Sequence, residues 1–231
     1  MNNRMKLLIK SGLPIVLMVY SLFAQAITTK EIKKETSQYV IDIKYPQGFK
    51  YAEVNTTIKE FIENTQDTFM NELSEDAKIP ADAPGKTGLN ITYSVPYNTN
   101  NALSIRFNVS VYHRGAAHPE NKVIVTNFLN GHGITLADLF VKEADYLDPI
   151  SRIANKEITA KKISDKQWIA EGTKPTNDNY SVWFFTNNGI AIIFNSYQVA
   201  AYVYGAQTVD IPFSAISKLI KPELAKVVWS A

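Results

Sequence analysis

The sequence predicts an α+β fold in which antiparallel strands pack with a long N-terminal helix, arranged in two lobes. Several short segments alternate hydrophobic and polar residues, as half-buried strands do. One long segment repeats its hydrophobic residues at three- and four-residue steps, as helices do. The segments follow one another as strand, helix, strands, helix and strands, which is an α+β order. The 231 residues include no cysteine, so a buried core and not disulfides must stabilise the chain.

The first 26 residues have the pattern of a secretory signal peptide. A basic start is followed by an apolar run from Leu13 to Phe23 and by the small-x-small step Ala24-Gln25-Ala26. We expect cleavage after Ala26 and a periplasmic or secreted protein, with a retained anchor as the alternative. Removal of Arg4, Lys6 and Lys10, and of no acidic residue, changes the formal charge from +2 to −1. That balance argues against nucleic acid as a partner, and no later stretch is apolar enough to cross a bilayer.

The predicted first lobe, residues 27–133, begins with a strand over 38–45 and a helix over 53–73, which Asn55 or Thr56 would cap. Two prolines and two glycines make 79–88 a loop. Strands over 89–95, 102–112 and 122–128 follow, most simply as an antiparallel meander, and Asn130-Gly131 marks a turn.

The predicted second lobe, residues 134–231, starts with a short helical turn at 135–140 that buries apolar side chains. Helical spacing over 144–162 contains Pro149, which favours a first turn or a break there. A polar loop over 171–180 precedes the rest of the lobe. That part is a hairpin of 181–185 with 189–195, a closing strand over 207–212, a helical segment over 213–219, and an apolar stretch that ends in Trp229.

The segment VYHRGAAHPENK, residues 111–122, contains two of the three histidines. His113, His118 and Glu120 are possible ligands of a zinc ion if the loop brings them together. The alternative is a turn in which Gly115 supplies an unusual backbone angle and Pro119 restricts His118. Neither a Gly-x-Ser-x-Gly elbow nor a phosphate-binding glycine loop accompanies them.

The segment SYQVAAYVYGAQ, residues 196–207, places Tyr197, Tyr202 and Tyr204 close together. Exposed tyrosines in such a cluster are suited to stack on sugar rings or to anchor a protein partner. The alternative is that they belong to the core with the nearby aromatic residues Trp183, Phe184, Phe185 and Phe194.

Four stretches taken together resemble the extracellular domains of the RsiV type. They are YPQGF (45–49), LSIRFNVSVYHRGAAHP (103–119), ITLADLF (134–140) and NNGIAIIFNSYQVAAYVYGAQTVDIPFSAI (187–216). The family's Tyr-x-Gly-Gly-Ala-His segment appears here with Gly115, Ala117 and His118, an alanine in place of the second glycine, and one extra residue. Its Thr-Leu-x-Asp-Leu-Phe segment is complete at 135–140. The resemblance covers residues 36–217, a PdaC-like lobe followed by an RsiV-like C-terminal lobe.

The resemblance implies a binding domain that faces the cell wall. The family includes the sensor part of a lysozyme-binding anti-sigma factor and domains that accompany a PdaC-type peptidoglycan deacetylase. We therefore expect a non-enzymatic module that recognises cell-wall glycan or a lysozyme-like hydrolase, without cofactor, metal or catalytic residue. The expected binding residues are His118, Arg114, Tyr197, Tyr202 and Tyr204, with His118 positioning its loop through a hydrogen bond. The rival hypothesis is a metal-dependent hydrolase of cell-wall or carbohydrate substrates that uses His113, His118 and Glu120.

Overall fold

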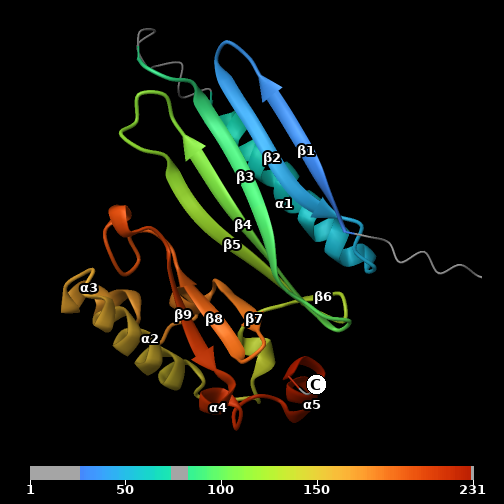
Figure 1. The fold of residues 1–231 in the computed structure, drawn as a ribbon, viewed down its shortest axis with the longest axis vertical. Coiled ribbons are helices and arrows are strands. Elements are labelled where there is room, and N and C mark those ends of the chain that lie inside the picture. The colour runs from blue at the N-terminus through green and yellow to red at the C-terminus, as the bar shows by residue number, and fades with distance from the viewer. Residues whose placement is uncertain (1–26, 74–82, 230–231) are drawn as a thin grey trace, which may run out of the picture.

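The computed structural model describes residues 27–73 and 83–229 and has the predicted α+β class. The predicted signal peptide and residues 79–82 of the predicted loop lie outside these ranges. Figure 1 shows two sheets, a six-stranded one backed by a long helix and a three-stranded one flanked by shorter helices. In the described part, no helix has the length and hydrophobicity that crossing a bilayer requires.

The six-stranded sheet has the strand order β1-β2-β3-β4-β5-β6. Its strands are β1 (Thr28–Glu35), β2 (Tyr39–Gln47), β3 (Thr87–Asn98), β4 (Ala102–Tyr112), β5 (Glu120–Leu129) and β6 (His132–Ile134). The predicted meander of β3, β4 and β5 is confirmed, since both pairings are antiparallel. β2 and β3 run parallel because α1 (Ala52–Glu72) crosses between them. β1 and β6 were not predicted.

The helix α1 covers one face of this sheet, behind the strands in Figure 1. Its three- and four-residue spacing buries Val54, Ile58, Ile62 and Phe69 against the alternating side chains of the strands, as predicted. The rings of Phe61 and Phe107 lie 4.7 Å apart between centroids. This face of the sheet and α1 together form the hydrophobic core of the first lobe, which includes Tyr39, Ile41, Ile43, Tyr45, Leu103, Ile105 and Val109.

The predicted side-chain cap of α1 is wrong. Tyr51 is the N-cap residue and makes no side-chain cap bond, because the helix begins before Asn55 and Thr56. Asn55 instead lies in the first turn and binds the preceding chain. Its Oδ1 accepts from the N–H groups of Gly48 and Phe49, and its Nδ2 donates to the carbonyls of Phe49 and Tyr51. Asn55 therefore fixes the tight connection between β2 and α1.

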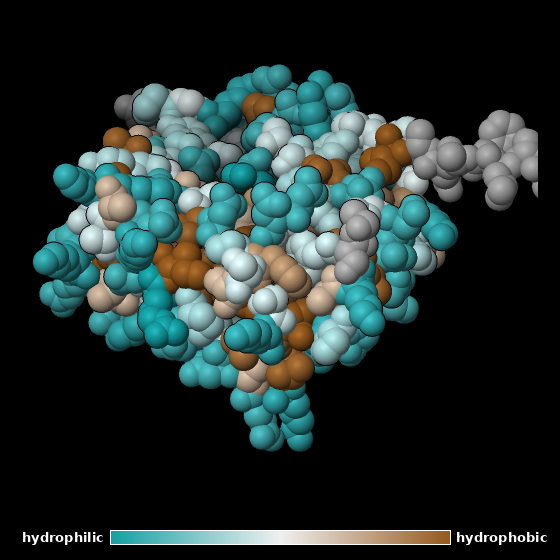
Figure 2. Space-filling view, turned by 60° about the horizontal axis from the view of Figure 1, so that its bottom comes forward, coloured by the Kyte–Doolittle hydropathy of each residue, from teal (hydrophilic) through white to brown (hydrophobic). Residues whose placement is uncertain are grey.

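The second lobe contains the antiparallel strands β7 (Trp183–Thr186), β8 (Gly189–Phe194) and β9 (Gln207–Pro212). Every residue of β8 is buried. The helices are α2 (Leu147–Lys161), α3 (Lys166–Gly172), α4 (Phe213–Ile216) and α5 (Pro222–Trp229), with 3-10 turns η2 (Ala137–Leu139), η3 (Asp178–Tyr180) and η4 (Tyr202–Tyr204). Figure 2 turns the bottom of Figure 1 forward and shows hydrophobic residues there between hydrophilic ones.

Most predictions for this lobe hold, with one difference. η2 lies within the predicted turn at 135–140, and Leu139 and Phe140 are buried there. Pro149 occupies the first turn of α2, where its missing N–H costs nothing. The predicted polar loop over 171–180, however, includes the end of α3 and all of η3. Asp165 caps α3, and its side chain accepts from the N–H of Trp168. Because α3 begins before the predicted loop, the composition of the loop did not reveal the helix.

The two lobes contact each other through the face of the large sheet that α1 does not cover. A shift of register between Ser94 and Tyr97 turns Tyr97 to this face, where its hydroxyl donates to the carbonyl of Val228 over 2.7 Å. Ser104 donates to Asn127 Oδ1 and accepts from the N–H of Phe185, while Asn127 Nδ2 donates to the carbonyl of Trp183. These buried bonds satisfy backbone groups of β7, an edge strand of the small sheet. The predicted division of the chain after residue 133 stays a prediction, and β6 extends one residue beyond it.

Candidate functional site

His118 and Tyr202 form a stacked pair between the lobes. Their ring centroids lie 3.9 Å apart at an interplanar angle of 19°. His118 lies on the loop between β4 and β5, and Tyr202 begins η4, so the pair joins the two lobes. The Tyr202 hydroxyl donates to the carbonyl of Pro119 over 2.8 Å and accepts from Asn121 Nδ2 over 2.6 Å. The phenol is therefore held in place by the loop that carries the histidine.

The hydrogen bonds of His118 define which ring nitrogen carries the proton. Nδ1 lies 3.0 Å from the carbonyl oxygen of Pro119, and Nε2 lies 3.3 Å from the hydroxyl of Tyr197. Because a carbonyl only accepts, Nδ1 donates to Pro119, and Nε2 faces the hydroxyl of Tyr197. Both ring nitrogens therefore have a hydrogen-bonding partner, one within the loop and one on Tyr197.

Tyr197 completes the cluster from the turn after β8. Its backbone has φ of 69°, which is uncommon for a residue with a side chain. Trp168 of α3 stabilises this conformation by donating from its indole N–H to the Tyr197 carbonyl over 2.9 Å. The Tyr197 ring remains 54% exposed, with its centroid 5.7 Å from that of Tyr202. A large, fixed and exposed ring of this kind is available to a ligand.

The three rings border a concavity that we call the aromatic hollow. Its volume is about 350 Å³. It is lined by Val111, His113, His118, Glu120, Asn121, Lys122, Asn195, Ser196, Tyr197 and Tyr202. Asn195 pairs with the open edge of β5, accepting from the Val123 N–H over 2.7 Å and donating to the Val123 carbonyl over 3.1 Å. This amide holds the small sheet against β5 and fixes the width of the hollow.

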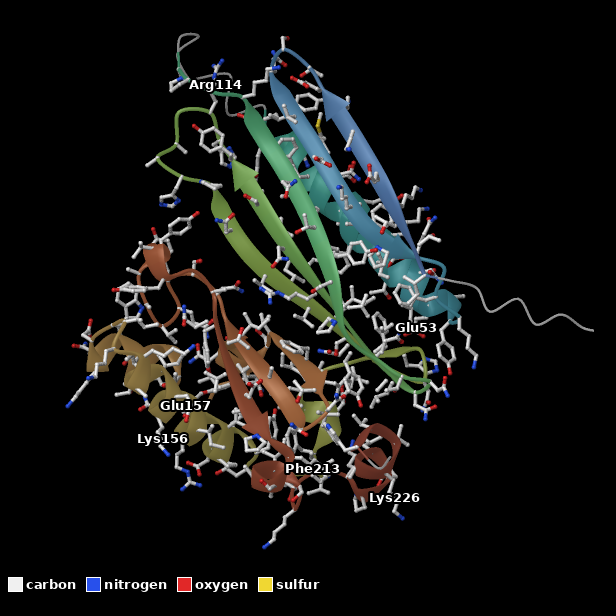
Figure 3. The ribbon with its side chains drawn as sticks, in the orientation of Figure 1. Glu53, Arg114, Lys156, Glu157, Phe213 and Lys226 are labelled. Atoms are coloured by element: carbon white, nitrogen blue, oxygen red, sulfur yellow. The ribbon has the colours of Figure 1, made fainter. Side chains whose placement is uncertain are left out.

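Two of the expected binding residues lie outside the hollow. Arg114 is on the side of its loop next to the start of β3, away from the second lobe, as Figure 3 shows. Its backbone N–H donates to the hydroxyl of Thr87 over 3.1 Å. Tyr204 is 49% exposed at the far end of η4 and does not line the hollow. The structure therefore brings together His118, Tyr197 and Tyr202, and not Arg114 or Tyr204.

The rival metal site is not assembled. His113 and Glu120 line the same hollow as His118, and His113 Nε2 lies 3.9 Å from Glu72 Oε2 on α1. Within residues 27–73 and 83–229, however, no three His, Asp or Glu side chains converge in a way that would hold a metal ion. His113, His118 and Glu120 are thus neighbours around a concavity and not a ligand set.

The aromatic residues divide between core and surface. Trp183, Phe185 and Phe194 are buried in the second lobe, whereas Tyr197 and Tyr204 are exposed. Tyr197 and Tyr204 are therefore surface residues, and the alternative that places them in the core with the neighbouring aromatic residues is wrong. Tyr180 is also buried in this core, where its hydroxyl donates to the carbonyl of Thr173, and burial raises its pKa to about 12.

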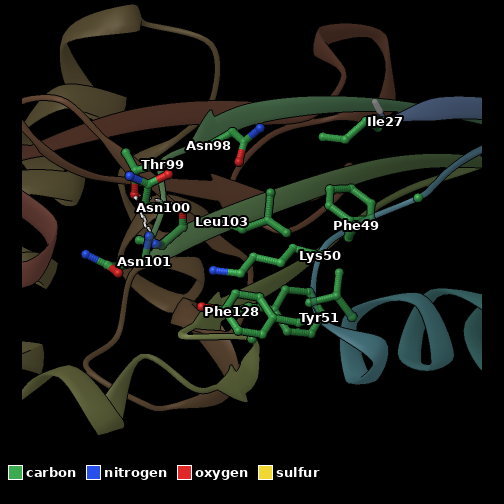
Figure 4. A pocket seen from close by; sticks show the side chains of 14 residues that line it. Ile27, Phe49, Lys50, Tyr51, Asn98, Thr99, Asn100, Asn101, Leu103 and Phe128 are labelled. Atoms are coloured by element: carbon green, nitrogen blue, oxygen red, sulfur yellow. Dashed lines mark hydrogen bonds between the residues drawn. The ribbon is translucent and has the colours of Figure 1, made fainter. Parts of the chain in front are cut away.

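A separate hollow of about 200 Å³, shown in Figure 4, lies at the start of α1, where the sequence predicted no site. It lies between Phe49, Tyr51 and Leu103 on one side and the β3–β4 turn at Asn98–Asn101 on the other. The asparagines of that turn predict a loop, but nothing in their spacing places them beside residues 49–51. Nearby, Glu53 accepts from His132 and from the N–H of Gly133, and these bonds lower its pKa below the usual value.

Comparisons with known proteins agree with this architecture. Residues 32–121 match the family model described as Deacetylase PdaC, and residues 137–214 match the one described as Protein of unknown function (DUF3298). The peptidoglycan-N-acetylmuramic acid deacetylase PdaC of Bacillus subtilis is 28% identical over 185 residues, which are 78% of this chain and 39% of that protein. The anti-sigma-V factor RsiV of the same organism is 25% identical over 215 residues, 89% of this chain and 74% of that protein. The chain thus spans about two fifths of the PdaC relative.

Two solved structures share the fold. A DUF3298 protein from Bacteroides fragilis has a TM-score of 0.63 at 18% identity, covering 90% of this chain and 99% of its own. One from Pseudomonas aeruginosa has a TM-score of 0.60 at 12% identity, covering 86% and 96%. At these identities the likeness concerns the fold alone.

Proposed function

Since the chain belongs to the RsiV/PdaC-type domain family, we propose that it is an exported, non-enzymatic binding module of the bacterial envelope that recognises cell-wall glycan through the aromatic hollow. The observation that carries this proposal is the stacked pair of His118 and Tyr202, with Tyr197 beside it. Rings fixed by hydrogen bonds lose little entropy on binding and offer flat faces to a pyranose.

The polar groups around the rings support a sugar ligand. Asn121 and Ser196 line the hollow and provide an amide and a hydroxyl group for sugar hydroxyls. The imidazole of His118 has both nitrogens engaged in contacts within the protein, which suits a role in binding more than in proton transfer. The name of the PdaC relative specifies a peptidoglycan substrate, which makes wall glycan the class of ligand to test first. A periplasmic or secreted location follows from the proposed signal peptide.

Co-sedimentation with purified insoluble peptidoglycan tests the proposal. We expect the wild-type protein to sediment with the wall, and Tyr202→Ala and Tyr197→Ala to lose most of this retention. Tyr204→Ala is the matched control, because it removes a tyrosine of about the same exposure as Tyr197 from the same region without touching the hollow. A wild-type protein that stays in the supernatant, or equal loss for Tyr204→Ala, would contradict the proposal.

A lysozyme-like hydrolase is a second candidate ligand, favoured by one observation. Val203 is 83% exposed between Tyr202 and Tyr204, and Tyr197 is exposed nearby. Exposed aliphatic and aromatic side chains on a rigid tip are typical anchors of protein partners. Size-exclusion chromatography with lysozyme, comparing wild type with Val203→Asp, distinguishes this candidate, because that substitution leaves the tyrosine rings unchanged. A complex that forms equally with both proteins would count against this surface.

A further inference from the structure

A second concavity, which we call the arginine groove, adjoins the aromatic hollow. Its volume is about 390 Å³, and it lies on the face of β3, β4 and β5 that α1 leaves uncovered, closed on one side by η4 and the residues after it. Tyr202 and Asn121 line both concavities. The other side chains that matter here are Asn90, Arg106, Asn108 and Ser110.

Strand register explains why these polar side chains meet. Arg106, Asn108 and Ser110 alternate along β4, so they share one face of the sheet. Asn90 on β3 and Asn121 on β5 are the cross-strand partners of Ser110 and extend the same row to both sides. The result is a polar floor of amides and a hydroxyl with one guanidinium at its end.

The guanidinium of Arg106 lacks a partner. Its Nε is buried and forms no hydrogen bond, and among the described residues none makes a hydrogen bond or ion pair with this side chain. No acidic residue lines the arginine groove. An unpaired, partly buried donor is unfavourable for the isolated protein, because folding removes its water without supplying an acceptor. A planar guanidinium is best satisfied by a carboxylate, which can accept two parallel bonds from it.

We propose that the arginine groove binds the carboxylate of an acidic sugar, with Arg106 as its partner and Tyr202 packing on the sugar ring. The inference rests on the proposed function and narrows it from wall glycan to the carboxylate-bearing sugar of that glycan. The amides of Asn90, Asn108 and Asn121 would bind the uncharged polar groups around the carboxylate. Tyr202, which borders both concavities, would let one glycan chain extend from the groove into the aromatic hollow.

The matched ligands for a test are N-acetylmuramic acid, its methyl ester and N-acetylglucosamine. They share the N-acetylated pyranose and differ in the lactyl carboxylate, which is charged, neutralised or absent. Dissociation constants come from titrations followed by ¹H–¹⁵N NMR. We expect the free acid to bind at least about tenfold more tightly than the other two, which is the order of magnitude of one charge-assisted contact.

Arg106→Met and Arg106→Lys separate a binding role from a structural one. We expect Arg106→Met to abolish the preference for the free acid and to leave the melting temperature unchanged or higher, because it removes an unsatisfied donor. Arg106→Lys should retain part of the preference. The inference is wrong if the wild type binds all three ligands equally, or if the preference for the free acid survives in Arg106→Met. In either case, retention on peptidoglycan would still support the proposed function. If the protein neither sediments with peptidoglycan nor binds any of the three sugars, both the proposed function and this inference are wrong.

Discussion

The Ser104–Asn127 hydrogen bonds between the lobes allow a quantitative prediction. Ser104→Ala leaves two buried groups without partners, the Phe185 N–H and Asn127 Oδ1. Asn127→Leu, which keeps a similar volume, also leaves two, the Trp183 carbonyl and the Ser104 hydroxyl. Each such group costs about 1–3 kcal/mol, so each variant should lose about 2–6 kcal/mol of unfolding free energy. This is a large share of the roughly 5–15 kcal/mol typical of a folded domain.

The double variant is the decisive one. With both side chains replaced, only the Phe185 N–H and the Trp183 carbonyl remain unpaired, again two groups. The double variant should therefore lose about as much as either single variant, far less than their sum. Urea unfolding followed by tryptophan fluorescence measures this, because all three tryptophans lie in the second lobe. Ser94→Ala, an exposed serine on β3, is the control and should change stability by less than about 0.5 kcal/mol. Additive losses would refute the view that the two side chains act as one unit.

Two further predictions concern turns that position the lobes. Gly131 has φ of +85°, and an added Cβ would lie 2.2 Å from Cγ of Tyr51, so Gly131→Ala should clearly lower the urea midpoint of unfolding. An added Cβ at Gly133 would meet nothing within 4 Å, so Gly133→Ala should leave the midpoint unchanged. Equal midpoints for the two variants would contradict this prediction. Asp138 accepts from the backbone N–H and the hydroxyl of Thr135, which lowers its pKa below the usual 3.8. Because the folded-state pKa is depressed, this stabilisation is present above pH 3.8 and is lost as the pH falls through the lower folded-state value. Asp138→Ala should thus cost about 1 kcal/mol at neutral pH, and its difference from wild type should disappear at low pH; a difference independent of pH would show that the carboxylate is not responsible.

The strands and the long helix were predictable because their hydrophobic periods follow directly from burial on one face. β4 and β9 have the predicted limits, and α1 begins within one residue of its prediction. β1 was missed for a physical reason. Most of its residues are exposed, and its sequence TTKEIKKE contains one apolar residue, so no alternation appears. Its pairing with β2 combines backbone hydrogen bonds with exposed cross-strand contacts such as Glu31–Lys44, which leave no hydrophobic alternation in the sequence.

The candidate site was predictable only in part. The local clustering of tyrosines and the histidine loop identified His118, Tyr197 and Tyr202, which meet although 79 residues or more separate the histidine from the tyrosines. Sequence spacing could not show that Arg114 and Tyr204 point elsewhere, since that depends on the direction of the β4–β5 loop and of η4. Trp168 lies far from both segments and Asn195 directly precedes the tyrosine segment, and only the packing of the lobes shows that these two residues hold the site.

Adding soluble muropeptides to the ¹⁵N-labelled protein tests whether it captures wall glycan without converting it. NMR spectra then report contact and chemical change in one sample. We expect the largest shifts at His118, Tyr197 and Tyr202, little change at His132 at the opposite end of the sheet, and muropeptides that remain intact over days. A spectrum that does not respond, or fragments that are hydrolysed or deacetylated by the wild-type protein, would contradict the account.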